Sequence, residues 1–252
     1  TLIFFWIIAI LIAYYLSKSS MKPIINSWHR QKEFSSNAAH ELRTPLTVIQ
    51  NQMEYLLTKP TDRIVDQIQP VSTTLDEVKH LKVLTQRLLT LARSDSNIVQ
   101  AQRQSIDLAP FFSSMVAPFN EIANSQNKSF ISNVDAEGTG RIDPDLIKQL
   151  MVILIDNAMK YTPQGGTVAV RINRTHNALK LMVSDTGNGI LDEDKQLIFE
   201  RFYRTDKSRN SKTGGNGLGL SIAKWIVDQH HGRITVRDNH PTGTIFTVTF
   251  NL

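Results

Sequence analysis

The stretch that decides the fold of this 252-residue chain runs Asn37-Ala38-Ala39-His40-Glu41-Leu42-Arg43-Thr44-Pro45-Leu46. From its end onward, apolar residues recur in alternating steps of four and three: Leu42, Leu46, Ile49, Met53 and Leu56. This spacing predicts a helix with a coiled-coil-like buried seam. His40 lies two residues from both Ala38 and Leu42, about 200° around the helix from each. His40 is therefore predicted to face water.

The residues next to His40 add chemistry to the same face. Thr44 follows His40 at i+4 and Arg43 at i+3, so both share its side of the helix one turn along. Pro45 removes its own amide and crowds the carbonyl of Glu41, so we expect the helix to bend or loosen there.

A second amphipathic helix is predicted after a polar turn at residues 58–62. Its apolar positions are Leu75, Val78, Leu81, Leu84, Leu88 and Leu91, and it ends near Asp95. The first steps of three drift from a strict heptad, which predicts local overwinding. Two helices with one apolar seam each bury those seams poorly as a lone hairpin but well as a four-helix bundle of two copies. A homodimer is therefore expected, unless the second domain covers the seam.

The first sixteen residues carry no charge and include a run of large apolar side chains. A membrane span needs about 20 such residues, so 1–16 is predicted to be the end of a transmembrane helix. The basic residues that follow are Lys18, Lys22, Arg30 and Lys32. They place the rest of the chain in the cytoplasm, at the cell membrane. A signal-peptide core and a buried soluble helix are the alternatives, and the first lacks a small-residue cleavage site.

Composition limits the chemistry that this chain can perform. It has no cysteine, which excludes disulfides, thiolate metal sites and cysteine nucleophiles, and its seven histidines show no metal-ligand spacing. The net charge of +5 suits an anionic ligand or a membrane surface. No nucleic-acid-binding motif is present, so no nucleic-acid partner is expected.

From residue 96 the pattern changes to alternating strands and helices, with Ser96-Asn97 as the hinge. Asp143 and Pro144 form a helix start, and that helix should run to about residue 160. Alternating apolar residues predict strands near 168–172, 179–183, 234–236 and 244–250, and helices are expected near 192–202 and 218–230. Helices on one face of a mixed sheet give an α+β sandwich. The predicted organisation is a transmembrane end at 1–16, a juxtamembrane linker at 17–33, a dimeric helical-hairpin domain at 34–95 and a sandwich domain at 96–252.

Polar residues in this second domain gather in four short stretches. Asn157, Lys160 and Tyr161 lie at i, i+3 and i+4 on one helix face. An amide oxygen can bind a hard cation, an ammonium can meet a phosphate, and an aromatic ring can line a base. Asp185 follows a strand, where its carboxylate can accept a hydrogen bond from an adenine amino group.

Glycines accompany these polar residues. Gly187 and Gly189 permit close backbone approach after Asp185. The stretch from Gly215 to Gly219 opens a helix whose amides favour phosphate. A dinucleotide-binding fold is excluded because its glycine fingerprint must follow the first strand of a parallel unit.

The His-Glu-Leu-Arg-Thr-Pro-Leu string resembles the phospho-accepting box of bacterial sensor histidine kinases. The ordered stretches from Asn157 to Phe246 resemble the ATP-binding domain of the same family, within the wider group of Hsp90-like and gyrase-like ATPases. The resemblance implies autophosphorylation on His40 from ATP with Mg²⁺, phosphoryl transfer to a response regulator receiver domain, and dephosphorylation of that regulator with Thr44 taking part. It also implies that Glu41 assists catalysis and that Asn157 is the magnesium ligand. The nucleotide-binding set is Asn157, Lys160, Tyr161, Asp185, Gly187, Gly189, Arg204, Gly215, Gly217, Leu218 and Gly219, and residues 203–216 correspond to a lid that carries Arg204, Lys207, Arg209 and Lys212.

One position departs from the family pattern. The family has asparagine four residues before the magnesium ligand, and this chain has Ile153. Because of Ile153, an ATP-binding scaffold without turnover stays open as an alternative to the kinase. A conformational ATPase is the other alternative, but such a protein needs no phospho-accepting helix, so the intact His40 box argues against it. The sequence does not identify the stimulus, the cognate regulator, or whether phosphorylation occurs in cis or in trans.

Overall fold

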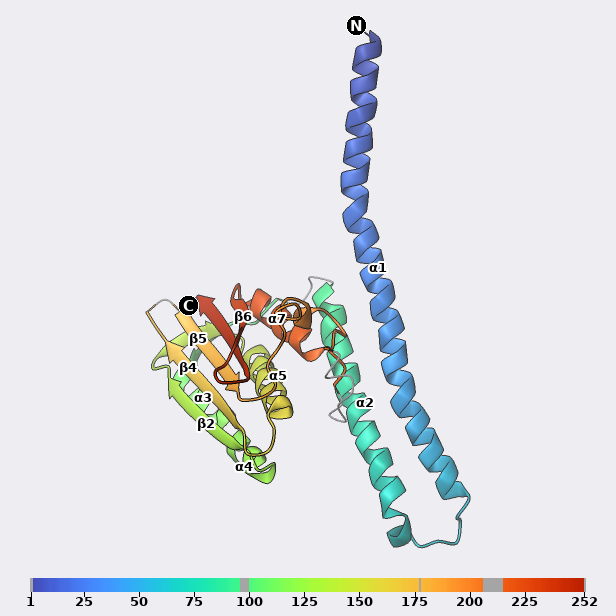
Figure 1. Cartoon of the computed structure of the whole chain (residues 1–252), viewed down its shortest axis with the longest axis vertical. Coiled ribbons are helices and arrows are strands. Elements are labelled where there is room, and N and C mark those ends of the chain that lie inside the picture. Colours follow the sequence, from blue (N-terminus) through green and yellow to red (C-terminus); the bar gives the residue numbers. More distant parts are fainter. Residues whose placement is uncertain (1, 96–99, 177, 206–214, 252) are drawn as a thin grey trace. The chain divides into compact units, whose positions relative to one another are not determined.

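The computed structural model describes residues 2–95, 100–176, 178–205 and 215–251 (Figure 1). Within them the chain forms two compact units, Thr1–Leu84 and Thr85–Leu252. The first unit is helical and the second contains all the described strands.

The first unit is a helical hairpin. Helix α1 spans Leu2–Leu57, the 3₁₀ turn η1 spans Ile64–Gln67, and helix α2 begins at Ile68 and ends at Asp95, beyond the boundary of the unit. Helix α1 continues through Pro45, which is buried. Pro45 therefore does not interrupt the helix; the bend or loosening expected beside it stays a prediction.

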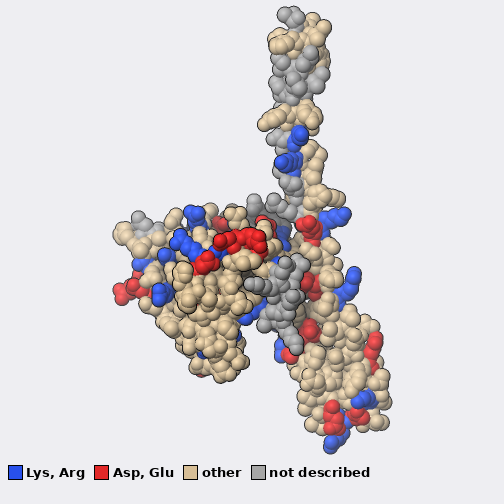
Figure 2. Space-filling view, viewed as in Figure 1, with Lys and Arg blue, Asp and Glu red and all other residues tan. Residues whose placement is uncertain are grey.

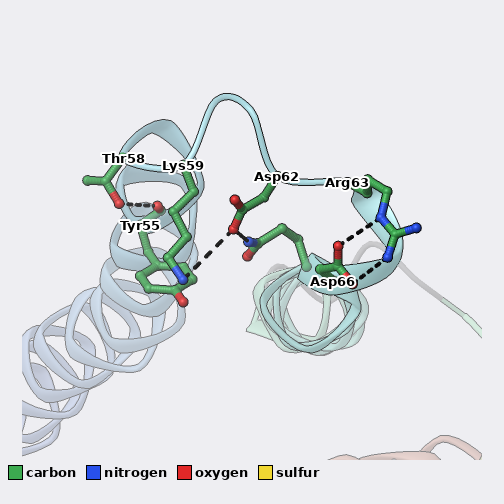
Figure 3. Close-up of polar contacts among 7 residues, drawn as sticks. Tyr55, Thr58, Lys59, Asp62, Arg63 and Asp66 are labelled. Carbon is green, nitrogen blue, oxygen red and sulfur yellow. Dashed lines mark hydrogen bonds and ion pairs between the residues drawn. The ribbon is translucent and has the colours of Figure 1, made fainter.

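Side chains fix the turn of the hairpin, as Figure 3 shows. Thr58 Oγ1 donates to the carbonyl of Tyr55 at 2.7 Å and closes the last turn of α1. Asp62 accepts a 2.6 Å hydrogen bond from Gln67 Nε2 and lies 4.0 Å from Lys59 Nζ. The predicted turn at residues 58–62 is thus confirmed, and Asp62 links the end of α1 to η1.

The two predicted apolar seams are only partly buried within one chain. On α1, Leu42, Ile49 and Leu56 are half-buried, but Leu46 and Met53 are exposed by 54% and 38%. On α2, Leu75 and Val78 are exposed as well, whereas Leu81 and Leu88 are half-buried and Leu84 and Leu91 are fully buried. A helix in a hairpin has one neighbour, which covers only one stripe of its surface.

The N-terminal end of α1 was predicted to be the end of a membrane span. The sequence has no charged residue before Lys18, and the described atoms at this end of the view in Figure 2 are coloured as neither basic nor acidic. Among the described residues, no helix is long and apolar enough to cross a membrane.

The second unit contains a five-stranded mixed sheet in the order β2-β4-β5-β7-β6. The strands are β2 (Ser129–Asp135), β4 (Thr167–Arg174), β5 (Ala178–Asp185), β6 (Arg233–Asp238) and β7 (Thr244–Asn251). Strands β2 and β4 are parallel, and the other neighbouring pairs are antiparallel. A separate antiparallel pair joins β1 (Gln104–Asp107) to β3 (Thr139–Ile142).

Helices cover one face of this sheet. They are α3 (Leu108–Val116), α4 (Pro118–Ser125), α5 (Pro144–Tyr161) and α7 (Gly219–Gln229), and each packs against at least one strand. Every second residue of the central strands is fully buried beneath them, as in Val168, Val170 and Ile172 of β4. The predicted α+β sandwich is confirmed for this unit, because one face of a sheet that packs on helices alternates in this way.

One of the predicted helices, α5, is confirmed, and another, near 192–202, is not. Asp143 caps α5 as predicted, since its side chain accepts hydrogen bonds from the amides of Asp145 and Leu146, both at 3.1 Å. The helix predicted near 192–202 is wrong, because only the 3₁₀ turn η2 (Leu197–Phe199) forms there. Long-range contacts hold this segment instead: Lys195 Nζ binds Asp238 of β6 at 2.6 Å.

Candidate functional site

The histidine of the opening stretch lies on the surface of α1. His40, Arg43 and Thr44 are exposed, whereas Glu41 is half-buried. This confirms the prediction that His40 faces water. The Thr44 hydroxyl lies 3.5 Å from the carbonyl oxygen of His40, at the long limit of a hydrogen bond, so it is loosely held. An exposed imidazole and a nearby hydroxyl thus share one face of the helix.

The C-terminal turn of α5 carries the second group of predicted site residues. Asn157, Lys160 and Tyr161 are half-buried, because the opposite face of α5 packs into the core. The Nζ atom of Lys160 lies 4.9 Å from the centre of the Tyr161 ring, within cation–π range. A Cβ atom placed on Gly215 would lie 2.4 Å from the same Nζ. The fold therefore brings Lys160 against the glycine-rich stretch that precedes α7.

Asp185, the last residue of β5, is the most buried carboxylate of the predicted set, with 4% exposure. Its Oδ1 atom accepts hydrogen bonds from the amides of Gly187 at 2.8 Å and Thr244 at 3.2 Å. Burial raises the pKa of this carboxyl, and the two amides oppose that rise. Within the described chain no group donates to Oδ2. The second oxygen is thus available to accept a hydrogen bond from a ligand.

Glycines let the backbone segments of this site approach one another. A Cβ atom on Gly187 would lie 2.4 Å from the carbonyl oxygen of Tyr161, and one on Gly243 would lie 1.9 Å from that of Asp185. Gly217 has a φ of +65°, in the left-handed region that glycine adopts most easily. Gly189 also has a positive φ, of +71°. Larger residues at Gly187 and Gly243 would push these segments apart.

The start of α7 completes the arrangement. Leu218 precedes the helix and is fully buried, and its apolar side chain makes no capping hydrogen bond to the first amides of the helix. Ile153 is 7% exposed, and its Cγ2 atom would lie 3.3 Å from a Cβ atom on Gly219. Ile153 therefore packs beneath the first residue of α7. Arg204, another predicted phosphate contact, is half-buried after η2.

Some predictions fall outside the described residues, and some site residues were not singled out from the sequence. Residues 206–214, which include the predicted lid residues Lys207, Arg209 and Lys212, lie outside the described part, as does the Ser96-Asn97 hinge. Two contacts to Asp185 were not predicted: the Thr244 amide and the side chain of Asn239, whose Nδ2 donates to the Asp185 carbonyl at 2.7 Å. The only sequence signal for them is the glycine-containing turn that ends at Gly243.

Comparison with known families assigns both parts of the chain. Residues 30–97 match the His Kinase A (phospho-acceptor) domain, and residues 142–252 match the histidine kinase-, DNA gyrase B-, and HSP90-like ATPase family. The chain belongs to the bacterial sensor histidine kinases. The exposed His40 lies in the first matched region and Asp185 in the second, so both halves of the predicted site fall within the family domains.

Individual histidine kinases agree with this assignment. The chain is 44% identical to the sensor protein CiaH of Streptococcus pneumoniae over 244 residues. This aligned region covers 97% of this chain and 54% of CiaH. It is 37% identical over 225 residues to the sensor histidine kinase WalK of Bacillus subtilis, covering 88% of this chain and 36% of WalK. The chain thus spans about half the length, or less, of these relatives.

A solved structure shares the fold. The histidine kinase ThkA, crystallised in complex with the response regulator protein TrrA, superposes with a TM-score of 0.67 at 22% identity, over 87% of this chain and 61% of that chain. At this level of identity the likeness concerns the fold alone.

Proposed function

We propose that this chain transfers the γ-phosphoryl group of ATP to His40 and then to an aspartate of a response regulator. The single observation that carries the proposal is the pairing of two features in one chain. An exposed histidine lies on a helix of the phospho-acceptor family, and a buried aspartate in the ATPase domain keeps one oxygen available for a ligand.

The nucleotide site has a group for each part of ATP. Oδ2 of Asp185 accepts a hydrogen bond from the amino group of adenine, which selects adenine over bases that lack this donor. Tyr161 lines the base, and Lys160 and Arg204 contact the phosphates. The amides at the start of α7, which the N-cap residue Leu218 does not cap, follow Gly215 and Gly217 and add the positive end of the helix dipole.

Asn157 supplies the protein ligand for Mg²⁺ in this proposal. Mg²⁺ prefers oxygen ligands and commonly takes only one or two from the protein, with phosphate oxygens and waters completing its shell. A half-buried amide one turn from Lys160 fits that requirement. Bound Mg²⁺ would offset the charge of the phosphates.

In the transfer step, the lone pair of an unprotonated ring nitrogen of His40 attacks the γ-phosphorus. The bond from that phosphorus to the bridging oxygen breaks, and ADP leaves with the electron pair. Glu41 follows His40 directly, and its carboxylate accepts a hydrogen bond from the other ring N–H. That interaction favours the positive charge that develops on the imidazole.

A homodimer follows from the apolar surface that a single hairpin leaves exposed. Leu46, Met53 and Leu57 of α1 and Leu75 and Val78 of α2 are all exposed by 38% or more. A second copy would bury these side chains in a four-helix bundle, which stabilises each copy by about 25 cal/mol per Å² of apolar surface.

A response regulator receiver domain is the proposed partner. The ThkA structure was solved with a response regulator, and His40 on an open helix face can reach the aspartate of such a domain. The same face carries Thr44, whose loosely held hydroxyl can position a water against an aspartyl phosphate. We therefore include dephosphorylation of the regulator in the proposal.

Attachment to the cell membrane, with the catalytic part in the cytoplasm, rests on the sequence alone. The uncharged residues 1–16 and the lysines after them carry this prediction. Protease treatment of sealed membrane vesicles would test it, because a cytoplasmic catalytic part is cleaved only from the cytoplasmic side.

Incubation with γ-labelled ATP and Mg²⁺ tests the proposed activity. We expect acid-labile label on the chain, and His40→Ala should remove it while ATP binding survives, since the acceptor and the nucleotide site belong to different domains. Release of free phosphate without label would favour a conformational ATPase, and neither product would favour a scaffold. Residual acid-labile label on His40→Ala would move the acceptor elsewhere, first to His80, which is exposed on α2.

A further inference from the structure

The turn between β6 and β7 is pressed against the main chain of Asp185. Gly243 approaches so closely that a Cβ atom there would lie 1.9 Å from the Asp185 carbonyl oxygen. Next to it, Asn239 Nδ2 donates a 2.7 Å hydrogen bond to that same oxygen. The turn is separated from Asp185 by 54 positions in the sequence, so this contact belongs to the tertiary fold.

Asn239 supplies a hydrogen bond to the end of β5, just beyond the last paired residues of β5 and β7. Strands β5 and β7 pair in register only as far as Ser184 and Ile245. Asp185 lies one residue beyond that pair, and the side-chain amide of Asn239 satisfies its carbonyl there. The other polar atoms of Asn239 bond within the turn. Its Oδ1 accepts a hydrogen bond from the His240 amide at 3.0 Å, and its main-chain N–H donates to the Gly243 carbonyl at 3.0 Å.

The carboxylate of Asp185 depends on the same turn. The Thr244 amide, which follows the turn directly, donates to Oδ1 at 3.2 Å, opposite the Gly187 amide. Both protein donors therefore use Oδ1, and this orients Oδ2 as the acceptor left for a ligand. A shift of the turn would move both the main chain and the carboxylate of Asp185.

We propose that Asn239 is a positioning residue for adenine recognition: its Nδ2 atom holds the end of β5 so that Oδ2 of Asp185 meets the amino group of the base. This inference rests on the proposed function, in which Asp185 reads adenine. Asn239 itself does not touch the nucleotide. Its loss should therefore cost only the part of the binding that depends on the adenine amino group.

The experiment compares two nucleotides on the full chain. One is ATP, and the other is the purine nucleoside triphosphate that lacks the exocyclic amine. Asn239→Ala should weaken ATP binding about three- to tenfold, the value of one hydrogen bond, and leave binding of the amine-free nucleotide unchanged. In the labelling reaction the KM for ATP should rise by the same factor while kcat stays constant.

Two further variants separate positioning from folding. Asn239→Asp is nearly isosteric and keeps an acceptor for the His240 amide but lacks the amide donor, so it should reproduce the loss of discrimination even if Asn239→Ala folds poorly. Thr242→Ala is the matched control. Thr242 is exposed in the same turn, and its side chain makes no hydrogen bond with any residue in the described ranges, so the ratio of the two Kd values should not change.

Equal weakening of both nucleotides by the Asn239 variants would show general loosening and overturn the inference, as would unchanged ATP binding. The proposed function can fail separately. If the unaltered chain binds no ATP, or does not discriminate between the two nucleotides, Asp185 is not an adenine reader, and the inference falls with it.

Discussion

His230, which directly follows α7, accepts a hydrogen bond through its Nε2 atom from the amide of Asp143 at the start of α5, at 3.1 Å. Its Nδ1 atom lies 2.9 Å from the Ile226 carbonyl, which fixes Nδ1 as the protonated nitrogen. The ring is 4% exposed. Only the neutral imidazole can satisfy both contacts, because the imidazolium has no acceptor.

This geometry predicts that stability falls in mild acid. Burial lowers the pKa of His230 from its ordinary 6.5, and the Arg103 and His231 charges act in the same direction, whereas the hydrogen bond to the Ile226 carbonyl and the Asp143 carboxylate oppose them. The unfolded chain then binds the proton more readily than the folded one, so the free energy of unfolding decreases as pH falls below about 6.5. Thermal unfolding between pH 7.5 and 5 measures this slope. His230→Gln should flatten it. His231→Gln, at the exposed neighbour, should change it only slightly, because the His231 charge is the smallest of these influences on His230. Equal slopes for all three would contradict the assignment.

Gly215→Ala should reduce ATP affinity with little effect on stability. The new Cβ atom would collide with the Nζ of Lys160, and because this is the end of a flexible side chain, Lys160 can move away. A displaced Lys160 would lose the phosphate contact that we propose for it, which is worth about tenfold in Kd. In the background of Lys160→Ala, the glycine substitution should have no further effect on ATP binding.

Gly217→Ala, in the same glycine-rich stretch, should lower stability, unlike Gly215→Ala. Here the Cβ atom would lie 2.6 Å from a main-chain atom of Phe202, at a φ of +65°, so the backbone itself must shift. We expect the free energy of unfolding to fall by about 1–3 kcal/mol. Similar unfolding midpoints for the two alanine variants would contradict the close packing of Gly217 against the main chain of Phe202.

Ile153→Asn restores the asparagine typical of the family. Its magnesium-dependent nucleotide affinity should change if position 153 borders the metal, as its place one turn before Asn157 suggests. Because Ile153 packs beneath Gly219, the substitution should also lower the free energy of unfolding, by about 2–4 kcal/mol unless the amide finds partners. Nucleotide titrations with and without Mg²⁺ measure the first effect, and Ile153→Val controls for altered packing. Titrations identical to those of the unaltered chain would remove the reason to link Ile153 to metal binding.

Thr44→Ala should lengthen the lifetime of the phosphorylated regulator while His40 labelling stays nearly intact. The reason is that the Thr44 hydroxyl is loosely held and can position the hydrolytic water. Thr47→Ala is the matched control, because Thr47 is exposed on the same helix and its hydroxyl donates to the Arg43 carbonyl at 3.0 Å. Time courses of regulator dephosphorylation measure this lifetime. An unchanged lifetime with Thr44→Ala would contradict the proposed role of Thr44.

The features that the sequence determined by itself are local ones. The exposure of His40 followed from helical periodicity, the shared face of Asn157, Lys160 and Tyr161 from a spacing of three and four, and the start of α5 from Asp143 and Pro144. Each depends on hydrogen bonds and side-chain directions within one or two turns of a helix, which neighbouring residues fix.

Only the tertiary structure decided which distant segments meet. It placed Gly215 against Lys160 and Asn239 against Asp185, and it replaced the helix expected near 192–202 by a 3₁₀ turn held through Lys195 and Asp238. It also divided the seam of α1 into a half-buried stripe and an exposed stripe that includes Leu46. No local pattern encodes these results, because each depends on which surface of one element another element covers.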